Sequence, residues 1–140
     1  MAPTITLRAQ IPELVRLNEW LQSLAERERF SSRLLFKIDL CLSELATNVI
    51  SYGYASRPAP EEALTVGYQR TATDAIFEIV DHGVPFDPTH YVPAPPAASL
   101  KEAEVGGRGL RLVQHYVGSM QHRRQGSDNH LTLKFPLREA

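Results

Sequence analysis

The stretch from Ser31 to Gly53 constrains the fold of this chain more than any other part of the sequence. Ser31 or Ser32 can cap a helix here, and Gly53 ends its pattern. The apolar residues share one broad helical face: Leu34, Leu35, Ile38, Leu42, Leu45, Val49 and Ile50. Such a face has to be removed from water, so the helix is expected to pack on a second layer.

The remaining periodic segments supply that layer. Alternating apolar and polar residues predict strands at 4–9, 64–70, 75–80, 119–124 and 130–137, the second and third forming a hairpin. Further helices are expected from Pro12 to about Arg29 and after Gly106. This order favours an α+β fold, a two-layer sandwich in which helices cover one face of a mixed or antiparallel sheet.

Composition narrows the class of protein. The chain has 140 residues, of which 43% are hydrophobic, and domains most often have roughly 100 to 150 residues, so a single domain over 1–140 is expected. The net charge of -1, from 15 basic and 16 acidic residues, provides no overall field for nucleic acid or an anionic membrane. No apolar run approaches the roughly 20 residues that span a bilayer and no signal peptide is visible, so we expect a cytoplasmic protein. Cys41 is expected to be a buried structural thiol.

The first of three short motifs is E-L-A-T-N, from Glu44 to Asn48, inside the expected second helix. Residues four apart on a helix differ by about 40° of rotation, so Glu44 and Asn48 share one strip at the edge of the apolar face. In a cleft, the carboxylate could accept a proton and the amide oxygen could bind a metal ion. Taken alone, these residues are more typical of a solvated helix edge.

The second motif is D-H-G-V-P-F-D, from Asp81 to Asp87, directly after the strand at 75–80. The Asp81 carboxylate could accept a hydrogen bond from an exocyclic amine, and Gly83 would let a ligand or the backbone approach closely. Taken alone, the motif is more typical of a simple turn.

The third motif is G-G-R-G-L, from Gly106 to Leu110, at the expected start of a helix. Free backbone N–H groups and the helix dipole favour an anion such as phosphate there. The motif is neither a Walker A loop nor a complete dinucleotide fingerprint, and alone it could simply end a loop. A long proline-rich stretch precedes it, and we interpret residues 88–106 as a lid.

Taken together and in this order, the three motifs resemble the GHKL ATPase superfamily. Its members include histidine kinases, gyrase-type ATPases, the ninety-kilodalton chaperones and mismatch-repair ATPases. The resemblance extends from about Ser31 to Leu137. Within the superfamily, the E-L-A-T-N motif followed by Tyr52-Gly53-Tyr54, and the helix start G-G-R-G-L-R-L-V, are similar to the bacterial anti-sigma-factor serine/threonine kinases.

The resemblance implies a GHKL (Bergerat) fold that binds ATP and Mg²⁺. Glu44 would be the general base, Asn48 would bind Mg²⁺, Asp81 would bind the adenine amino group, and Gly83 would shape the adenine pocket. The third motif would contact the phosphates through Gly106, Gly107, Arg108, Gly109 and Leu110, with the clearest roles for Gly107 and Gly109.

The chain departs from this family in two places. The kinases often carry a Gly-Thr pair before the last strand, where this chain has Gly126-Ser127-Asp128-Asn129-His130, so no residue is assigned to that adenine contact. The expected lid has little basic charge apart from Lys101 and Arg108, so no arginine is assigned to clamp the phosphates.

The resemblance also implies a function. It indicates a protein serine/threonine kinase that phosphorylates a hydroxyl group of a STAS-type anti-anti-sigma protein and sequesters a sigma factor, with a possible homodimer through a sheet edge or the first helix. One alternative is a non-catalytic nucleotide-sensing module that captures a signalling regulator. Another is a regulator of the same family acting on a phosphatase or cyclase pathway.

The histidines suggest no further site. All five lack the spacing of a zinc site, and we expect His82 to be a loop residue and not a catalytic one. The basic cluster His122-Arg123-Arg124 could contact an acidic partner but is more typical of a solvated strand edge.

Overall fold

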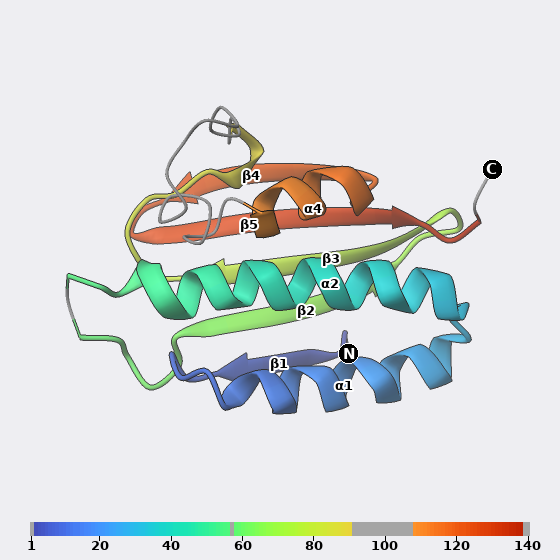
Figure 1. The fold of residues 1–140 in the computed structure, drawn as a ribbon, viewed down its shortest axis with the longest axis horizontal. Helices are drawn as coiled ribbons and strands as arrows, with labels where there is room; N and C mark the ends of the chain where they lie inside the picture. Colours follow the sequence, from blue (N-terminus) through green and yellow to red (C-terminus); the bar gives the residue numbers. More distant parts are fainter. Residues whose placement is uncertain (1, 57, 91–107, 139–140) are drawn as a thin grey trace.

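The computed structural model describes residues 2–56, 58–90 and 108–138, with only the backbone described at His90 and Arg108. Five strands form one antiparallel sheet in the order β1-β2-β3-β5-β4 (Figure 1). The strands are β1 Thr4–Leu7, β2 Leu64–Arg70, β3 Asp74–Asp81, β4 Ser119–Gln125 and β5 Asp128–Pro136.

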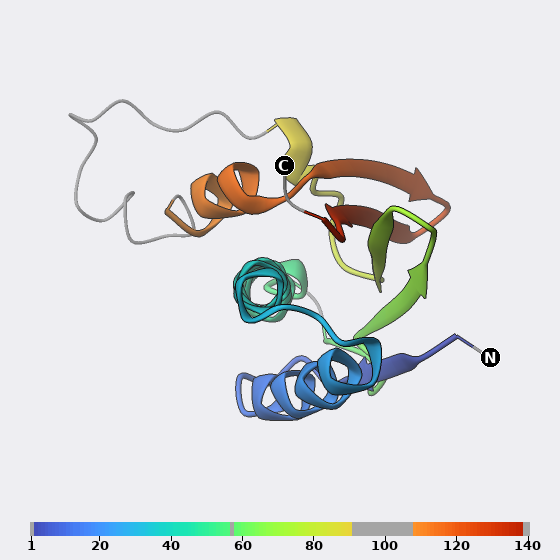
Figure 2. The ribbon, with the colours of Figure 1, turned by 90° about the vertical axis from the view of Figure 1, so that its right-hand side faces the viewer.

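Within the described residues, three helices cover one face of this sheet: α1 Glu13–Glu28, α2 Ser32–Asn48 and α4 Arg108–Tyr116 (Figure 2). The Ser31 hydroxyl caps α2 by accepting a hydrogen bond from the Leu34 N–H at 3.1 Å. A π-helical turn, η1 Val49–Gly53, continues α2, and a short 3₁₀ turn, η2 Pro88–His90, follows β3. No helix in the described part of the chain is long and apolar enough to cross a membrane.

The core lies between the sheet and the helices. Alternate residues of β2 and β3 pair across the strands with both side chains facing the helices, as in Val66 with Ile79 and Tyr68 with Phe77. Cys41 is fully buried on α2, as predicted. Burial, assisted by the nearby negative charge of Glu44, raises the pKa of the Cys41 thiol to about 12, so the thiol stays protonated and unreactive.

The predicted α+β sandwich and the hairpin of β2 and β3 are confirmed, and the sheet is antiparallel throughout. The first strand ends at Leu7 and not at residue 9, because the Arg8 N–H donates to the Glu13 carboxylate at 3.0 Å instead of to a strand. The last strand is displaced toward the N-terminus, to Asp128–Pro136. Most of the expected lid, 91–106, lies outside the described residues.

Candidate functional site

The end of α2 approaches the loop after β3 through two glycines. A Cβ atom placed on Gly83 would lie 2.6 Å from the Gly53 carbonyl oxygen, which is closer than real Cβ contacts allow. The Val84 N–H donates to that same oxygen at 3.0 Å. The π-helical turn and the loop are therefore joined backbone to backbone, and only glycine at position 83 permits the contact.

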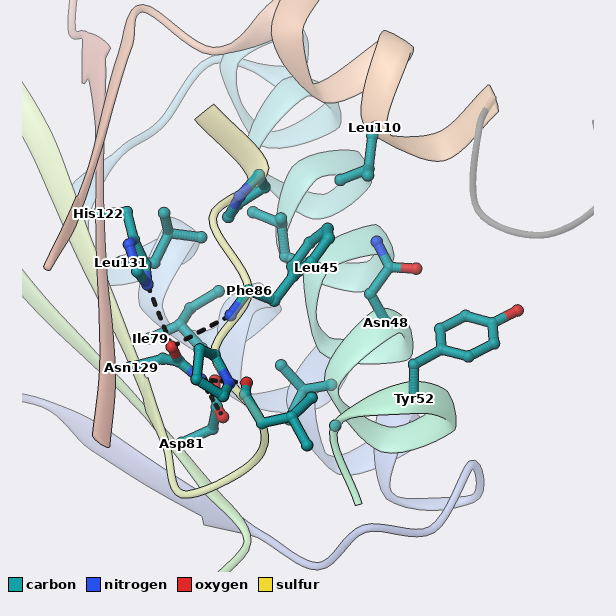
Figure 3. Close-up of a pocket in the computed structure, with 15 residues that line it drawn as sticks. Leu45, Asn48, Tyr52, Ile79, Asp81, Phe86, Leu110, His122, Asn129 and Leu131 are labelled. Carbon is teal, nitrogen blue, oxygen red and sulfur yellow. Dashed lines mark hydrogen bonds between the residues drawn. The ribbon is translucent and has the colours of Figure 1, made fainter. Parts of the chain in front are cut away.

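A pocket of about 300 Å³ opens between α2, the sheet and this loop. Much of its lining is apolar, with Leu45 on the helix side and Ile79 and Leu131 on the sheet side (Figure 3). Val49 of η1 also lines the pocket. Leu110 of α4 closes one end. The size and the apolar walls suit a flat organic group that is oriented by a few polar contacts.

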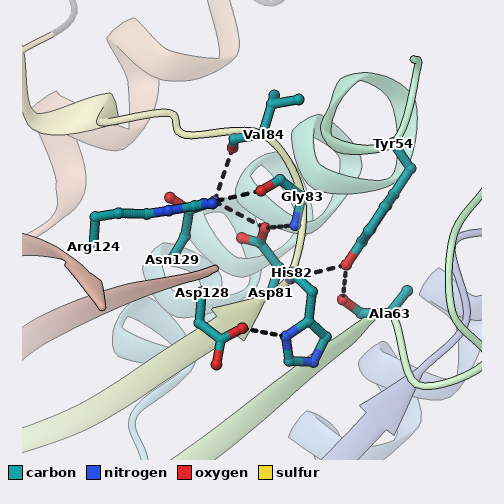
Figure 4. Close-up of polar contacts among 9 residues, drawn as sticks. All are labelled: Tyr54, Ala63, Asp81, His82, Gly83, Val84, Arg124, Asp128 and Asn129. Carbon is teal, nitrogen blue, oxygen red and sulfur yellow. Dashed lines mark hydrogen bonds and ion pairs between the residues drawn. The ribbon is translucent and has the colours of Figure 1, made fainter. Parts of the chain in front are cut away.

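Two polar side chains that are buried in the described core lie side by side at this pocket. Asp81 is 7% exposed and Asn129 is 4% exposed, and they pair directly across β3 and β5. Asp81 Oδ1 accepts hydrogen bonds from the Gly83 N–H at 2.9 Å and from Asn129 Nδ2 at 3.0 Å (Figure 4). Both described bonds of this carboxylate go to Oδ1, so Oδ2 is left to accept a bond from a ligand.

The loop beside Asp81 is held by further polar contacts. Arg124 of β4 donates to the Gly83 carbonyl at 2.9 Å, and the Tyr54 hydroxyl accepts from the His82 N–H at 2.9 Å (Figure 4). The same hydroxyl donates to the Ala63 carbonyl. These bonds fix the backbone that carries Asp81 and Gly83, which preorganises the pocket.

Asn48 lines the helix side of the pocket (Figure 3). Its Nδ2 atom is buried and has no hydrogen-bond partner among the described residues. The two ends of an amide are exchangeable by rotation, so either its oxygen or its nitrogen can face a ligand. A buried amide nitrogen without a partner fits a site completed by an anionic ligand, and with the amide turned over its oxygen could bind a metal ion.

Glu44 lies one turn before Asn48, against α4. A Cβ atom on Gly109 would lie 2.0 Å from Glu44 Oε2, so the missing side chain of Gly109 makes room for the carboxylate. In the described part of the chain, no group of three or more His, Cys, Asp or Glu residues gathers to hold a metal ion. A metal ion here would take ligands from a substrate and water, as Mg²⁺ commonly does.

The structure thus brings together most of the motif residues that it describes. Asn48, Asp81 and Leu110 line the pocket, Gly83 packs against Gly53 at its edge, and Glu44 and Gly109 contact each other next to it. Gly106 and Gly107 lie outside the described residues, as does the side chain of Arg108.

One interpretation of the sequence was wrong. His122 and Arg124 do not lie on a solvated edge: His122 is only 10% exposed and lines the pocket, and Arg124 bonds Gly83. Alternation along β4 directs both side chains toward the helices and leaves only Arg123 of the cluster exposed. The sequence analysis also missed Asn129, which the same rule could have found, because Leu131, Leu133 and Phe135 place it on the inward face of β5.

Comparison with known proteins identifies the family. Residues 7–135 match the family described as the histidine kinase-like ATPase domain. The chain belongs to this family. It is 36% identical over 114 residues to the serine/threonine-protein kinase BtrW of Bordetella bronchiseptica, a match that covers 81% of this chain and 79% of that protein.

A solved structure supports the same fold. The RsbU and RsbW domains of Rv1364c from Mycobacterium tuberculosis match with a TM-score of 0.68 at 16% identity, over 96% of this chain and 31% of that one. At this identity the match shows the fold alone. Family membership implies that this histidine kinase-like ATPase domain binds ATP, and its sequence is homologous to that of a serine/threonine kinase.

Proposed function

We propose that this chain is an ATP-dependent protein serine/threonine kinase of the anti-sigma type. The observation that carries the proposal is the pocket with Asp81 on the sheet side and, on the helix side, the buried Asn48 Nδ2, which has no hydrogen-bond partner among the described residues. The 36% identity to the serine/threonine kinase BtrW supports the same activity.

In this proposal the apolar pocket receives adenine. Asp81 Oδ2 would accept a hydrogen bond from the adenine amino group, while the Gly83 N–H and Asn129 hold Oδ1. An acceptor fixed in this way discriminates against bases that present an acceptor at the same position, because the carboxylate would then be left unpaired. Gly83 serves the site by keeping the loop close to α2.

The phosphates would lie toward the N-terminus of α4, where backbone N–H groups favour an anion. Gly106, Gly107, Arg108 and Gly109 are the residues that we propose to contact them, with Leu110 at the boundary of the pocket. Asn48 would supply one oxygen ligand to Mg²⁺, which would neutralise charge on the phosphates when bound.

Glu44 is proposed as the general base. Its carboxylate would accept the proton of a serine or threonine hydroxyl as the hydroxyl oxygen forms a bond to the γ-phosphorus. The bond between the γ-phosphorus and the bridging oxygen breaks at the same step, and ADP leaves with that electron pair. The position of Glu44, one helical turn from Asn48 and in contact with Gly109, supports this role.

The acceptor would be a STAS-type anti-anti-sigma protein, and the kinase domain would also sequester a sigma factor. The resemblance of the E-L-A-T-N and G-G-R-G-L motifs to those of anti-sigma-factor kinases supports such partners. A second candidate is a non-catalytic module that senses nucleotide and captures a regulator. One observation favours it: Glu44 is not among the residues that line the pocket.

Calorimetric titration with ATP tests the binding site. We expect the wild type to bind ATP more tightly with Mg²⁺ than without it, and Asn48→Ala to lose this dependence on Mg²⁺. Asn18→Ala is the control, since Asn18 bonds Asp39 at an exposed site remote from the pocket. Absence of ATP binding in the folded wild type would refute the proposal.

Transfer of labelled phosphate to a panel of purified STAS-domain proteins separates the two candidates. Labelled product that Glu44→Ala abolishes while ATP binding persists supports the kinase. ATP binding without product from any member of the panel favours the sensing module.

A further inference from the structure

Asn129 uses its whole amide group inside the protein. Nδ2 donates to Asp81 Oδ1 at 3.0 Å and to the Val84 carbonyl at 2.9 Å. The amide oxygen accepts from His122 Nε2 at 3.1 Å and makes a longer contact with the Phe86 N–H at 3.5 Å. Both donors are therefore occupied, and so is the acceptor, which leaves no strong bond for a ligand.

The orientation of this amide follows from its neighbours. Asp81 and the Val84 carbonyl can only accept, so the nitrogen must face them and the oxygen must face His122. His122 must then carry hydrogen on Nε2, while its Nδ1 lies 3.7 Å from the Asp87 carboxylate. A chain of hydrogen bonds thus runs from His122 through Asn129 to Asp81 (Figures 3 and 4), and the Asp87 carboxylate lies beyond His122.

We infer that Asn129 is a positioning residue that sets the base selectivity of the pocket. Its hydrogen bond to Asp81 Oδ1 fixes that oxygen, so that only Oδ2 faces the base. A second hydrogen bond from the same nitrogen holds the Val84 carbonyl. His122 keeps the amide from rotating. Asn129 acts on the nucleotide through Asp81, because its own hydrogen-bonding groups are used within the protein.

This inference rests on the proposed ATP site, and it makes a prediction that is specific to position 6 of the purine. Adenine carries an amino group there, whereas hypoxanthine carries an oxygen that would face the carboxylate. A fixed Asp81 favours ATP over inosine triphosphate. A loosened Asp81 loses the bond to the amino group and can turn away from the oxygen, so the two affinities converge.

The experiment is calorimetric titration with ATP and with inosine triphosphate in the presence of Mg²⁺. Asn129→Ser shortens the side chain and removes the bonds to Asp81 and Val84 without adding charge. Asn129→Asp replaces the donor by a second carboxylate. Each variant loses the hydrogen bond that orients the charged Asp81 carboxylate toward the base. We therefore expect each variant to bind ATP about 10- to 100-fold more weakly, with a much smaller change in the affinity for inosine triphosphate.

Asn18→Asp is a matched control. Asn18 also donates to an aspartate, Asp39 at 3.2 Å, but on the exposed surface between α1 and α2. We expect this variant to retain the wild-type affinity ratio. Circular dichroism and thermal melts confirm that each variant is folded, and Asn129→Ser is the informative variant if Asn129→Asp does not fold.

The outcomes are distinguishable. Equal weakening of both nucleotides in folded Asn129→Ser would overturn the inference, since a purely structural role damages the whole pocket. An unchanged ratio and unchanged affinities would overturn it as well. A folded wild type that binds neither nucleotide would remove the proposed function and this inference with it.

Discussion

Replacing Gly83 by alanine tests the backbone contact that shapes the pocket. The new Cβ would lie 2.6 Å from the oxygen and 2.9 Å from the carbonyl carbon of Gly53. Both are backbone atoms at the end of the π-helical turn, so no side chain can rotate away to relieve the clash. The loop and the helix end must separate, which also breaks the hydrogen bond from Val84 to Gly53.

The expected loss of stability combines two effects. Overpacking of a well-packed contact costs about 1–3 kcal/mol, and the lost backbone hydrogen bond adds about 0.5–1.5 kcal/mol. We expect the free energy of unfolding to fall by about 2–4 kcal/mol in urea denaturation. ATP affinity should fall as well, because the Gly83 N–H that orients Asp81 is displaced.

Gly67→Ala is the matched control for this substitution. Gly67 lies in β2, and among the described residues its Cβ would meet only the Thr4 Cγ2 atom at 3.6 Å, an ordinary contact distance. We expect a change within about 0.5 kcal/mol there. If Gly83→Ala were as stable as Gly67→Ala and bound ATP like the wild type, the close approach of the two backbones would be refuted.

Two further substitutions test the site and the pH response. Gly109→Ala would place its Cβ 2.0 Å from Glu44 Oε2. Because a flexible carboxylate can move, we expect little change in the free energy of unfolding in urea, but a loss of phosphoryl transfer approaching that of Glu44→Ala, about 10²- to 10⁴-fold. Normal transfer by this variant would show that the general base does not act from this position. The hydrogen bond from His82 lowers the pKa of Asp128 below 3.8, so the stability that this carboxylate contributes is present above that value and is lost as pH falls through the lower folded pKa. Urea denaturation from pH 5 to pH 2 should therefore show a smaller loss in the free energy of unfolding for Asp128→Asn than for the wild type. The same dependence of this free energy on pH in both proteins would contradict a stabilising hydrogen bond between His82 and Asp128.

Much of the fold could be predicted because its signals are local. The apolar face of α2 follows from helical spacing, and the hairpin of β2 and β3 follows from alternation on either side of a short turn. Ends of elements were less accurate where a side chain competes with the backbone, as Glu13 does for the Arg8 N–H. The boundary of β1 depends on that competition and not on the strand pattern.

The polar residues of the site show a similar division. Glu44, Asn48 and Asp81 stand in recognisable motifs, so the sequence alone indicated them. Asn129 and His122 carry no motif, and their roles arise because β5 lies between β3 and β4 in the sheet. Asn129 bonds a residue 48 positions away, a distance over which spacing along the chain gives no information.

The sequence by itself determined the helices, the strands and the order of three motifs, because each depends on spacing between near neighbours. Only the tertiary structure decided that Asn129 faces Asp81, that Gly83 meets Gly53, and that Gly109 makes room for Glu44. These contacts join distant segments, and they form because burying the shared core fixes the strand register and the packing of α2 and α4.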